Sequence, residues 1–169
     1  MIAPPAGAER LGGNAVGLEP WTSITLRTPV GEELRLTGTP ARHGPPGGDR
    51  GPVVGFLITA DDGDAIYISG DSVWFDGVKE IATRADVRVA FLFMGAARVR
   101  EVGPAHLTLT AAEGVLVARA MPNATLVPLH YEGWEHFSEG RSAIEAAFTE
   151  AGLAHRLRWL PPGQSVTLA

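Results

Sequence analysis

The sequence predicts an α/β or α+β domain in which helices cover a sheet. The order of elements indicates this class, because two hairpin patterns come first and an alternation of strands and helices follows. The chain has 169 residues, 45% of them hydrophobic and 20% charged, which is typical of one globular domain. A chain of this length can bury a sizeable core, so the composition excludes wholesale disorder.

Composition also narrows the classes of function. Lys and Arg number 14 against 19 Asp and Glu, and no basic run is present, so nucleic acid is not an expected partner. The absence of cysteine excludes disulfides, thiolate zinc sites and a cysteine nucleophile, which leaves His, Asp and Glu as metal ligands. No signal sequence or long apolar run is evident, so we expect a cytoplasmic protein without a membrane partner.

The first part of the chain predicts a lead-in and then a hairpin. Residues 1–22 are rich in Gly, Ala and Pro without a clear period, so we expect them to be irregular. Residues 23–28 and 33–37 alternate apolar and polar side chains around a Pro-Val-Gly turn, which predicts two paired strands. Four side chains would form the buried face of this hairpin: Ile24, Leu26, Leu34 and Leu36.

The rest of the chain predicts a second hairpin and then strands alternating with helices. The strands of that hairpin are 53–58 and 65–69, with Asp62-Gly63 as the turn signal. Thr110 and Glu113 have the spacing of a capping box that opens a helix. The remaining predicted elements are a helix near 78–82, a strand at 87–93, a helix ending near Ala120, a strand at 125–129, a helix at 142–151 and strands at 156–160 and 165–168. We expect residues 23–169 to form one domain.

Three ionisable residues follow the carboxyl ends of predicted strands. His43, Asp71 and His130 each stand there, and Gly70 would allow the tight turn that presents Asp71. Ligands bind at this rim in open α/β sheets, and two imidazoles with a carboxylate suit zinc, iron(II) or manganese. The alternatives are that the histidines are ordinary loop residues and that Asp71 caps a turn or a helix.

Three segments in this order resemble the second half of the metallo-β-lactamase fold: Thr39–His43, Ile66–Ser72 and Leu126–Tyr131. They are most similar to the branch of L-ascorbate-6-phosphate lactonase-like hydrolases. The resemblance implies a partial αββα sandwich, mainly its C-terminal half. It also implies that His43 binds one metal ion, that Asp71 bridges two ions and is catalytic, and that His130 completes the second site, with Zn²⁺ expected and Mn²⁺ or Fe²⁺ as alternatives.

The sequence departs from that family at its defining motif. His-x-His-x-Asp-His would precede these segments, yet no histidine occurs before His43. We therefore expect a truncated and impaired metal-dependent hydrolase, in which a metal-bound hydroxide would attack an ester-like bond such as a lactone or a phosphodiester. The alternative is a non-catalytic fragment or pseudoenzyme that acts as a binding module. A third reading is a mononuclear site with different chemistry, which would retain a metal by itself.

Further residues are candidates for contact with a small-molecule substrate: His106, Tyr131, Trp134 and His136. His106 precedes a predicted helix at the same rim, and the other three follow His130 closely. Loss of half a sandwich would also expose a sheet face and edge. For that reason we expect a homo-oligomer formed through the exposed sheet surface.

Overall fold

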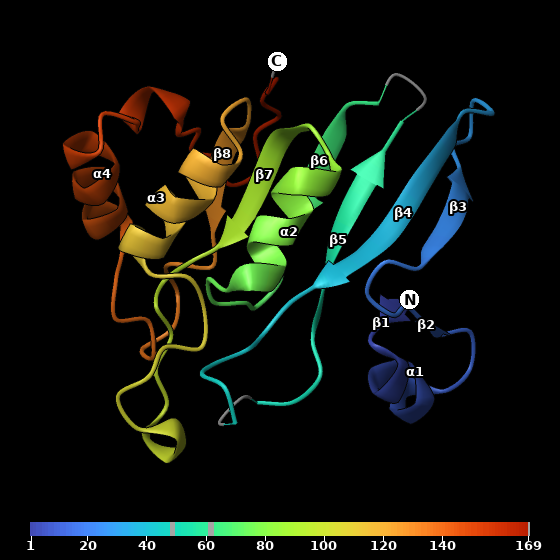
Figure 1. Cartoon of the computed structure of the whole chain (residues 1–169), viewed down its shortest axis with the longest axis horizontal. Coiled ribbons are helices and arrows are strands. Elements are labelled where there is room, and N and C mark those ends of the chain that lie inside the picture. The colour runs from blue at the N-terminus through green and yellow to red at the C-terminus, as the bar shows by residue number, and fades with distance from the viewer. Residues whose placement is uncertain (48–49, 61–62, 169) are drawn as a thin grey trace.

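A six-stranded sheet forms the centre of the molecule (Figure 1). The computed structural model describes residues 1–47, 50–60 and 63–168. Neighbouring strands are antiparallel from β3 to β6 and parallel from β6 to β8. In spatial order the strands are β3 (Ser23–Arg27), β4 (Glu33–Pro40), β5 (Val54–Thr59), β6 (Ala65–Ile68), β7 (Val87–Phe93) and β8 (Thr125–Leu129). Both expected hairpins are therefore present, although the Asp62-Gly63 turn lies partly outside the described residues.

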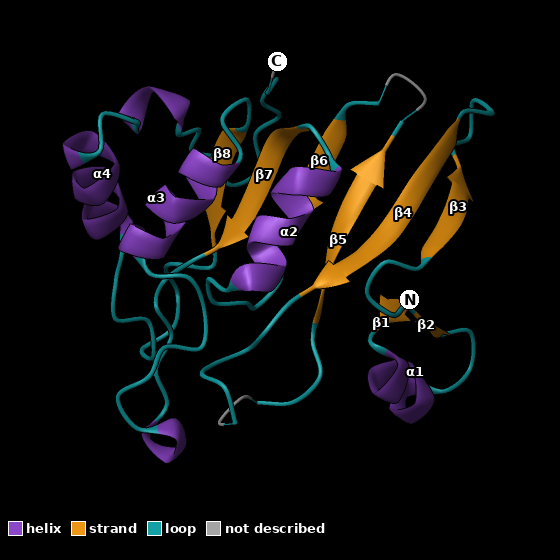
Figure 2. Cartoon of the chain, viewed as in Figure 1, coloured by secondary structure: helices purple, strands orange, loops and turns teal. Residues whose placement is uncertain are grey.

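Three helices lie on the same face of this sheet (Figure 2). They are α2 (Asp76–Arg84), α3 (Ala111–Ala120) and α4 (Arg141–Glu150). The predicted capping box opens α3, since the Glu113 amide donates to Thr110 Oγ1 and the Thr110 amide donates to Glu113 Oε2, both at 3.0 Å. The main core lies between sheet and helices and includes Tyr67, Leu92, Leu126, Ile81 and Phe148. This arrangement confirms the predicted α/β class with helices over a sheet.

The first hairpin was predicted to bury one apolar face, and the structure corrects this prediction. Leu36 is buried, but Ile24 and Leu34 are only half-buried and Leu26 is 38% exposed. The alternation correctly places these side chains on one face, yet that face points away from the three helices. Alternation identifies a common face, and tertiary packing decides whether that face is covered.

Residues 1–22 were expected to be irregular, but they form regular elements. It contains β1 (Ile2–Ala3), helix α1 (Pro5–Leu11) and β2 (Val16–Gly17), and the two short strands pair in parallel. Pro5 suits the first helical position because its ring fixes φ at a helical value, and Gly12 follows the helix with φ +64°. The helix signals at the two ends of α1, Pro5 and Gly12, therefore predict this helix better than its weak apolar periodicity does.

The C-terminal segment corrects two further predictions. Residues 156–160 and 165–168 are not strands, and the short 3₁₀-helix η2 (Ala154–Arg156) occupies the start of the first range. Leu157 forms one isolated bridge with Leu126 at the edge of β8. At η2 the chain turns, and residues after Leu157 do not pair with the sheet as a strand. Pro161-Pro162 lacks the amide donors that a ladder needs.

The helices are too short or too polar to cross a membrane. This finding covers the described residues.

Tyr67 provides a stability prediction for this core. Its hydroxyl is fully buried and has no hydrogen-bond partner among the described residues, and burial raises the pKa of Tyr67 far above its usual value of 10.0. We expect Tyr67→Phe to be as stable as the wild type at pH 7, or about 1 kcal/mol more stable, because an unsatisfied buried group is removed.

The same raised pKa predicts a loss of stability at alkaline pH. The folded state keeps the proton that the unfolded state releases, so the contribution is complete below pH 10 and falls above it by about 1.4 kcal/mol per pH unit. Urea unfolding from pH 8 to 11 should show this decline in the wild type and less of it in Tyr67→Phe. A decline equally steep in Tyr67→Phe would contradict the prediction.

Candidate metal site

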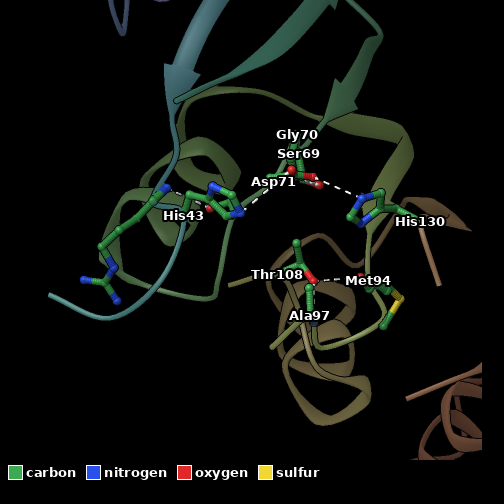
Figure 3. Close-up of polar contacts among 10 residues, drawn as sticks. His43, Ser69, Gly70, Asp71, Met94, Ala97, Thr108 and His130 are labelled. Carbon is green, nitrogen blue, oxygen red and sulfur yellow. Dashed lines mark hydrogen bonds and ion pairs between the residues drawn. The ribbon is translucent and has the colours of Figure 1, made fainter. Parts of the chain in front are cut away.

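Three strand ends bring the predicted metal ligands together. Strands β4, β6 and β8 run in the same direction, so their carboxyl ends share one edge of the sheet. His43 lies in the loop after β4, Asp71 follows β6, and His130 is the first residue after β8. Figure 3 shows the Asp71 carboxylate between the two imidazole rings. The sheet therefore brings together residues that are 87 positions apart in sequence, as the strand-end argument predicted.

The distances around Asp71 fit metal ligation better than hydrogen bonding. His43 Nε2 lies 3.8 Å from Asp71 Oδ2, and His130 Nε2 lies 3.8 Å from Asp71 Oδ1. Both gaps exceed the ~3.2 Å limit of a good hydrogen bond. They are shorter than the ~4.2 Å that two metal–ligand bonds of ~2.1 Å can span. Donor type and spacing therefore suit a divalent cation on either side of the carboxylate.

Few metal-binding atoms surround either oxygen of the Asp71 carboxylate. The two histidines face different oxygens of Asp71, which gives two half-sites with one nitrogen and one oxygen each. Within residues 1–47, 50–60 and 63–168, no three His, Cys, Asp or Glu side chains converge enough to hold one ion. A catalytic zinc has three protein ligands, so each half-site provides fewer than that number.

Short polar contacts hold the Asp71 turn in place. Gly70 has φ +57°, a left-handed conformation that glycine adopts easily, as the sequence predicted. Ser72 is buried, and its Oγ accepts a hydrogen bond from the Arg42 amide at 3.0 Å and donates one to the Val73 carbonyl. Since Arg42 precedes His43, Ser72 links the loop that carries one imidazole to the turn that carries the carboxylate.

Aromatic rings and a strained backbone orient His130. The residue has φ +56°, which is unusual for a residue other than glycine. Its ring stacks on Phe93 at 5.5 Å and meets Phe137 edge-on at 4.6 Å. The Nδ1 atom is buried without a hydrogen-bond partner among the described residues. The rings therefore fix the imidazole while Nε2 faces Asp71.

Comparison with known proteins identifies the family. Residues 3–131 match the family model described as "Beta-lactamase superfamily domain". The chain belongs to the metallo-β-lactamase superfamily. A UPF0173 metal-dependent hydrolase from Myxococcus xanthus is 27% identical over 124 residues, which cover 73% of this chain and 40% of that relative.

Solved structures support the superfamily fold. A possible metal-dependent hydrolase from Veillonella parvula superposes with a TM-score of 0.80 at 16% identity, over 98% of this chain and 65% of that one. An isothiocyanate hydrolase from Delia radicum gut bacteria superposes with a TM-score of 0.74 at 20% identity, over 92% of this chain and 59% of that one. The chain thus spans less than two thirds of each of these relatives, and its metallo-β-lactamase fold is partial by comparison.

Two of the predicted substrate-contact residues connect through aromatic rings to His130, one of the candidate metal ligands. Trp134 is 68% exposed, and its ring centroid lies 5.8 Å from that of His136. The His136 centroid lies 4.7 Å from that of Phe137. Phe137 in turn contacts His130. This row of rings leads from the surface to the site.

The other two predicted contact residues have different surroundings. Tyr131 turns its ring to Trp159 at 5.3 Å, and its pKa is raised mainly by burial. The His106 ring lies against the Arg98 guanidinium, with nitrogen–nitrogen distances of 3.2 and 3.3 Å. Neither contact reaches the Asp71 carboxylate.

Sequence reasoning missed several residues that shape this site. Ser69 Oγ accepts from the Phe93 amide, and buried Thr108 accepts from the Ala97 amide and donates to the Met94 carbonyl (Figure 3). Phe137 belongs to the same group because it packs on His130. Ser69 had a usable signal, since it directly precedes Gly70-Asp71. Thr108 and Phe137 had none, because their roles depend on a loop folding back over β7 and β8.

A substitution at Gly95 tests this close packing around His130. Its φ is +88°, and a Cβ there would lie 2.5 Å from the His130 carbonyl oxygen and 3.0 Å from the Phe137 ring. We expect Gly95→Ala to lower the free energy of unfolding by about 2 kcal/mol or more, through backbone strain and steric overlap. Urea denaturation followed by circular dichroism measures the loss.

Gly133→Ala is the matched control. Gly133 has a similar φ of +90°, but no atom of the described residues lies within 4 Å of the point that a Cβ would occupy there, so the backbone strain of about 1 kcal/mol is the expected cost. Equal losses in the two variants would show that contact with His130 adds nothing at Gly95.

Proposed function

We propose that this chain carries the Asp71 portion of a metal-dependent hydrolase site that cleaves an ester-like bond, a lactone or a phosphodiester. The chain is distantly homologous to proteins named metal-dependent hydrolases, which supports the reaction class. The observation that carries the proposal is the Asp71 carboxylate, with an imidazole nitrogen 3.8 Å from each of its oxygens.

The residues have distinct tasks in this proposal. Asp71 offers one oxygen to each side, and His43 and His130 provide the nitrogen ligands, which suits Zn²⁺ first and Mn²⁺ or Fe²⁺ as alternatives. A bound cation would supply the Lewis acid that polarises the bond to be broken. Asp71 would be the central catalytic residue because it serves both half-sites.

A small-molecule substrate would approach from the exposed side. The Asp71 side chain is 36% exposed, and the side chains of His43 and His130 are 21% and 26% exposed, so solvent and substrate reach all three. The rings of Trp134 and His136 would line the approach to His130 and contact an apolar part of the substrate. His106 and Tyr131 are weaker candidates, since their contacts lead away from Asp71.

One observation favours a second candidate function, a non-catalytic binding module. Among the described residues each half-site has two donors, which predicts weak metal binding and slow turnover in this chain by itself. In that case the site would hold a cation or a ligand without converting it.

Metal content and hydrolysis, measured on the same preparation, test the proposal. The chain is purified without chelator, and its zinc, manganese and iron are determined by elemental analysis before and after dialysis against Zn²⁺. Hydrolysis is then assayed with nitrophenyl esters, bis(nitrophenyl) phosphate and a lactone panel. We expect bound metal and a slow hydrolysis that stops with chelator and returns with Zn²⁺.

The outcomes distinguish the two functions. Bound metal without hydrolysis of any substrate would favour the binding module. A folded chain that takes up no metal from excess Zn²⁺ would overturn the hydrolase proposal. Circular dichroism provides the control for folding in both cases.

A further inference from the structure

We infer that Arg98 and His106 form an oxyanion site beside the candidate metal site, where they bind a carboxylate or a phosphate group. The inference is based on a guanidinium that has no acidic partner, on a mismatched contact between the two side chains, and on their attachment to the rings beside His130. The role of this site in holding an anionic end of the substrate rests on the hydrolase proposal above.

The guanidinium of Arg98 is available to an anion. Arg98 is exposed, and no carboxylate pairs with it in the part of the chain that the structure describes. This holds although Glu101 and Glu135 belong to the neighbouring loop segments. By contrast, four other arginines each pair with a carboxylate: Arg27, Arg84, Arg88 and Arg141.

The contact between Arg98 and His106 cannot satisfy both side chains. Arg98 Nε lies 3.2 Å from His106 Nδ1, and Arg98 Nη2 lies 3.3 Å from His106 Nε2. A guanidinium only donates hydrogen bonds, and a neutral imidazole accepts through one ring nitrogen. Whichever ring nitrogen carries the proton, one of the two contacts therefore brings two N–H groups together. An oxyanion between the side chains would accept from both, and it suits the planar fork of arginine.

Backbone hydrogen bonds hold the Arg98–His106 pair in place. The Leu107 amide donates to the Ala97 carbonyl at 2.8 Å, and the Ala97 amide donates to Thr108 Oγ1 at 3.0 Å (Figure 3). These bonds close the base of the loop between the paired residues, which extends beyond the carboxyl-end edge of the sheet (Figure 1). The two side chains thus face each other at the base of this loop, and His106 is half-buried there.

The pair adjoins the row of rings that leads to His130. The Arg98 amide donates to the His136 carbonyl at 2.8 Å. The ring of His136 contacts that of Phe137, and Phe137 contacts His130. A substrate whose cleavable bond lies at Asp71 would follow these rings and place an anionic group at Arg98. The expected substrate is therefore an elongated ester with an anionic end group.

Anion binding without metal tests the site independently of hydrolysis. The isotope-labelled full chain, with chelator present and at constant ionic strength, is titrated with acetate, with inorganic phosphate and with neutral acetamide. Nuclear magnetic resonance follows the Arg98 Nε–H and His106 ring signals. We expect saturable shifts with acetate or phosphate and none with acetamide. The anion with the lower dissociation constant shows whether carboxylate or phosphate is preferred.

Three variants show whether the contact is specific. Arg98→Gln should raise the anion dissociation constant at least ~10-fold, because a charged donor is lost. Arg98→Lys should cause a smaller loss, since it keeps the charge without the fork. Arg100→Gln is the matched control: Arg100 is an exposed arginine of the same loop, and among the described residues it makes no hydrogen bond with His106. Circular dichroism confirms that each variant is folded.

The Michaelis constant tests the role in substrate binding. The zinc-loaded chain is assayed with neutral nitrophenyl acetate, with mononitrophenyl succinate and with nitrophenyl phosphonopropionate. Arg98→Gln should raise KM for the preferred anionic ester at least ~10-fold and leave kcat and the neutral ester unchanged. An unchanged KM for both anionic esters would overturn the substrate role.

Failure of the site and failure of the hydrolase proposal give different results. Hydrolysis of no ester would count against the hydrolase, and the titration would still decide whether the anion site exists. The inference is overturned if neither anion shifts the Arg98 and His106 signals, or if Arg98→Gln and Arg100→Gln weaken binding equally.

Discussion

Asp71→Asn should abolish metal binding while leaving the fold intact. The amide keeps the shape of the carboxylate but loses its charge and one ligand oxygen, and that residue serves both half-sites. Loss of an outer partner of a metal ligand lowers affinity ~10–100-fold, so loss of the shared ligand itself should exceed that range. Zinc titration against a chromophoric chelator measures the change, and any hydrolysis should disappear with it.

Asp76→Asn is the control for this prediction. Asp76 is also an aspartate near the same turn, but its side chain is 93% exposed and pairs with Lys79 at 2.7 Å. The Lys79 ammonium lowers the pKa of Asp76 through a hydrogen bond, so this carboxylate is charged at neutral pH and still is not a ligand. Wild-type zinc affinity in Asp71→Asn, or an equal loss in Asp76→Asn, would contradict the assignment of Asp71.

The second large effect concerns Arg156, which connects the C-terminal segment to α3 and β8. Its guanidinium donates to the carbonyls of Ala118 at 2.6 Å, of Ala124 at 2.6 and 3.0 Å, and of Met121. Two of these carbonyls belong to the end of α3, where a helix leaves acceptors unsatisfied and favours a cation. Burial lowers the pKa of Arg156, but the group stays charged at any working pH.

Arg156→Met should therefore lower the free energy of unfolding by about 3 kcal/mol or more, because three carbonyls lose a charged donor. For a chain of this size that loss lowers Tm by roughly 6–12 °C. Urea and thermal unfolding measure both quantities.

Arg158→Met is the matched control, since Arg158 is exposed and donates to carbonyls within its own segment. A surface substitution of this kind changes stability by less than about 0.5 kcal/mol. Similar losses in the Arg156 and Arg158 variants would show that the contacts to α3 contribute little.

Local signals predicted the elements that depend on nearby residues. The apolar run at 87–93 and the segment 125–129 match β7 and β8, and Thr110 opens α3 as its spacing to Glu113 predicted. These outcomes follow because strand alternation and helix caps involve contacts within a few residues. The C-terminal strands failed for the opposite reason, since the position of residue 156 depends on carbonyls more than thirty residues earlier.

The candidate site likewise has features that local sequence predicted and features that it did not. The positions of His43, Asp71 and His130 after strands predicted that they share one edge, because residue order and strand direction decide that. The packing of Phe137 on His130 depends on a loop between distant elements. The same holds for the lack of space at Gly95, where an added Cβ would lie 2.5 Å from the His130 carbonyl oxygen. No local pattern encodes such contacts.

The sequence by itself determined the α/β class, the hairpins and the three residues that line one edge of the sheet. Tertiary structure decided which sheet face the helices cover: the three helices pack on one side, and Ile24 and Leu34 lie on the other side and are only half-buried. It also decided that Asp71 lies between two imidazoles in two half-sites rather than in one three-ligand site among the described residues. The physical reason is that alternation and residue order act along the chain, whereas burial and ligand geometry depend on which surfaces meet in space.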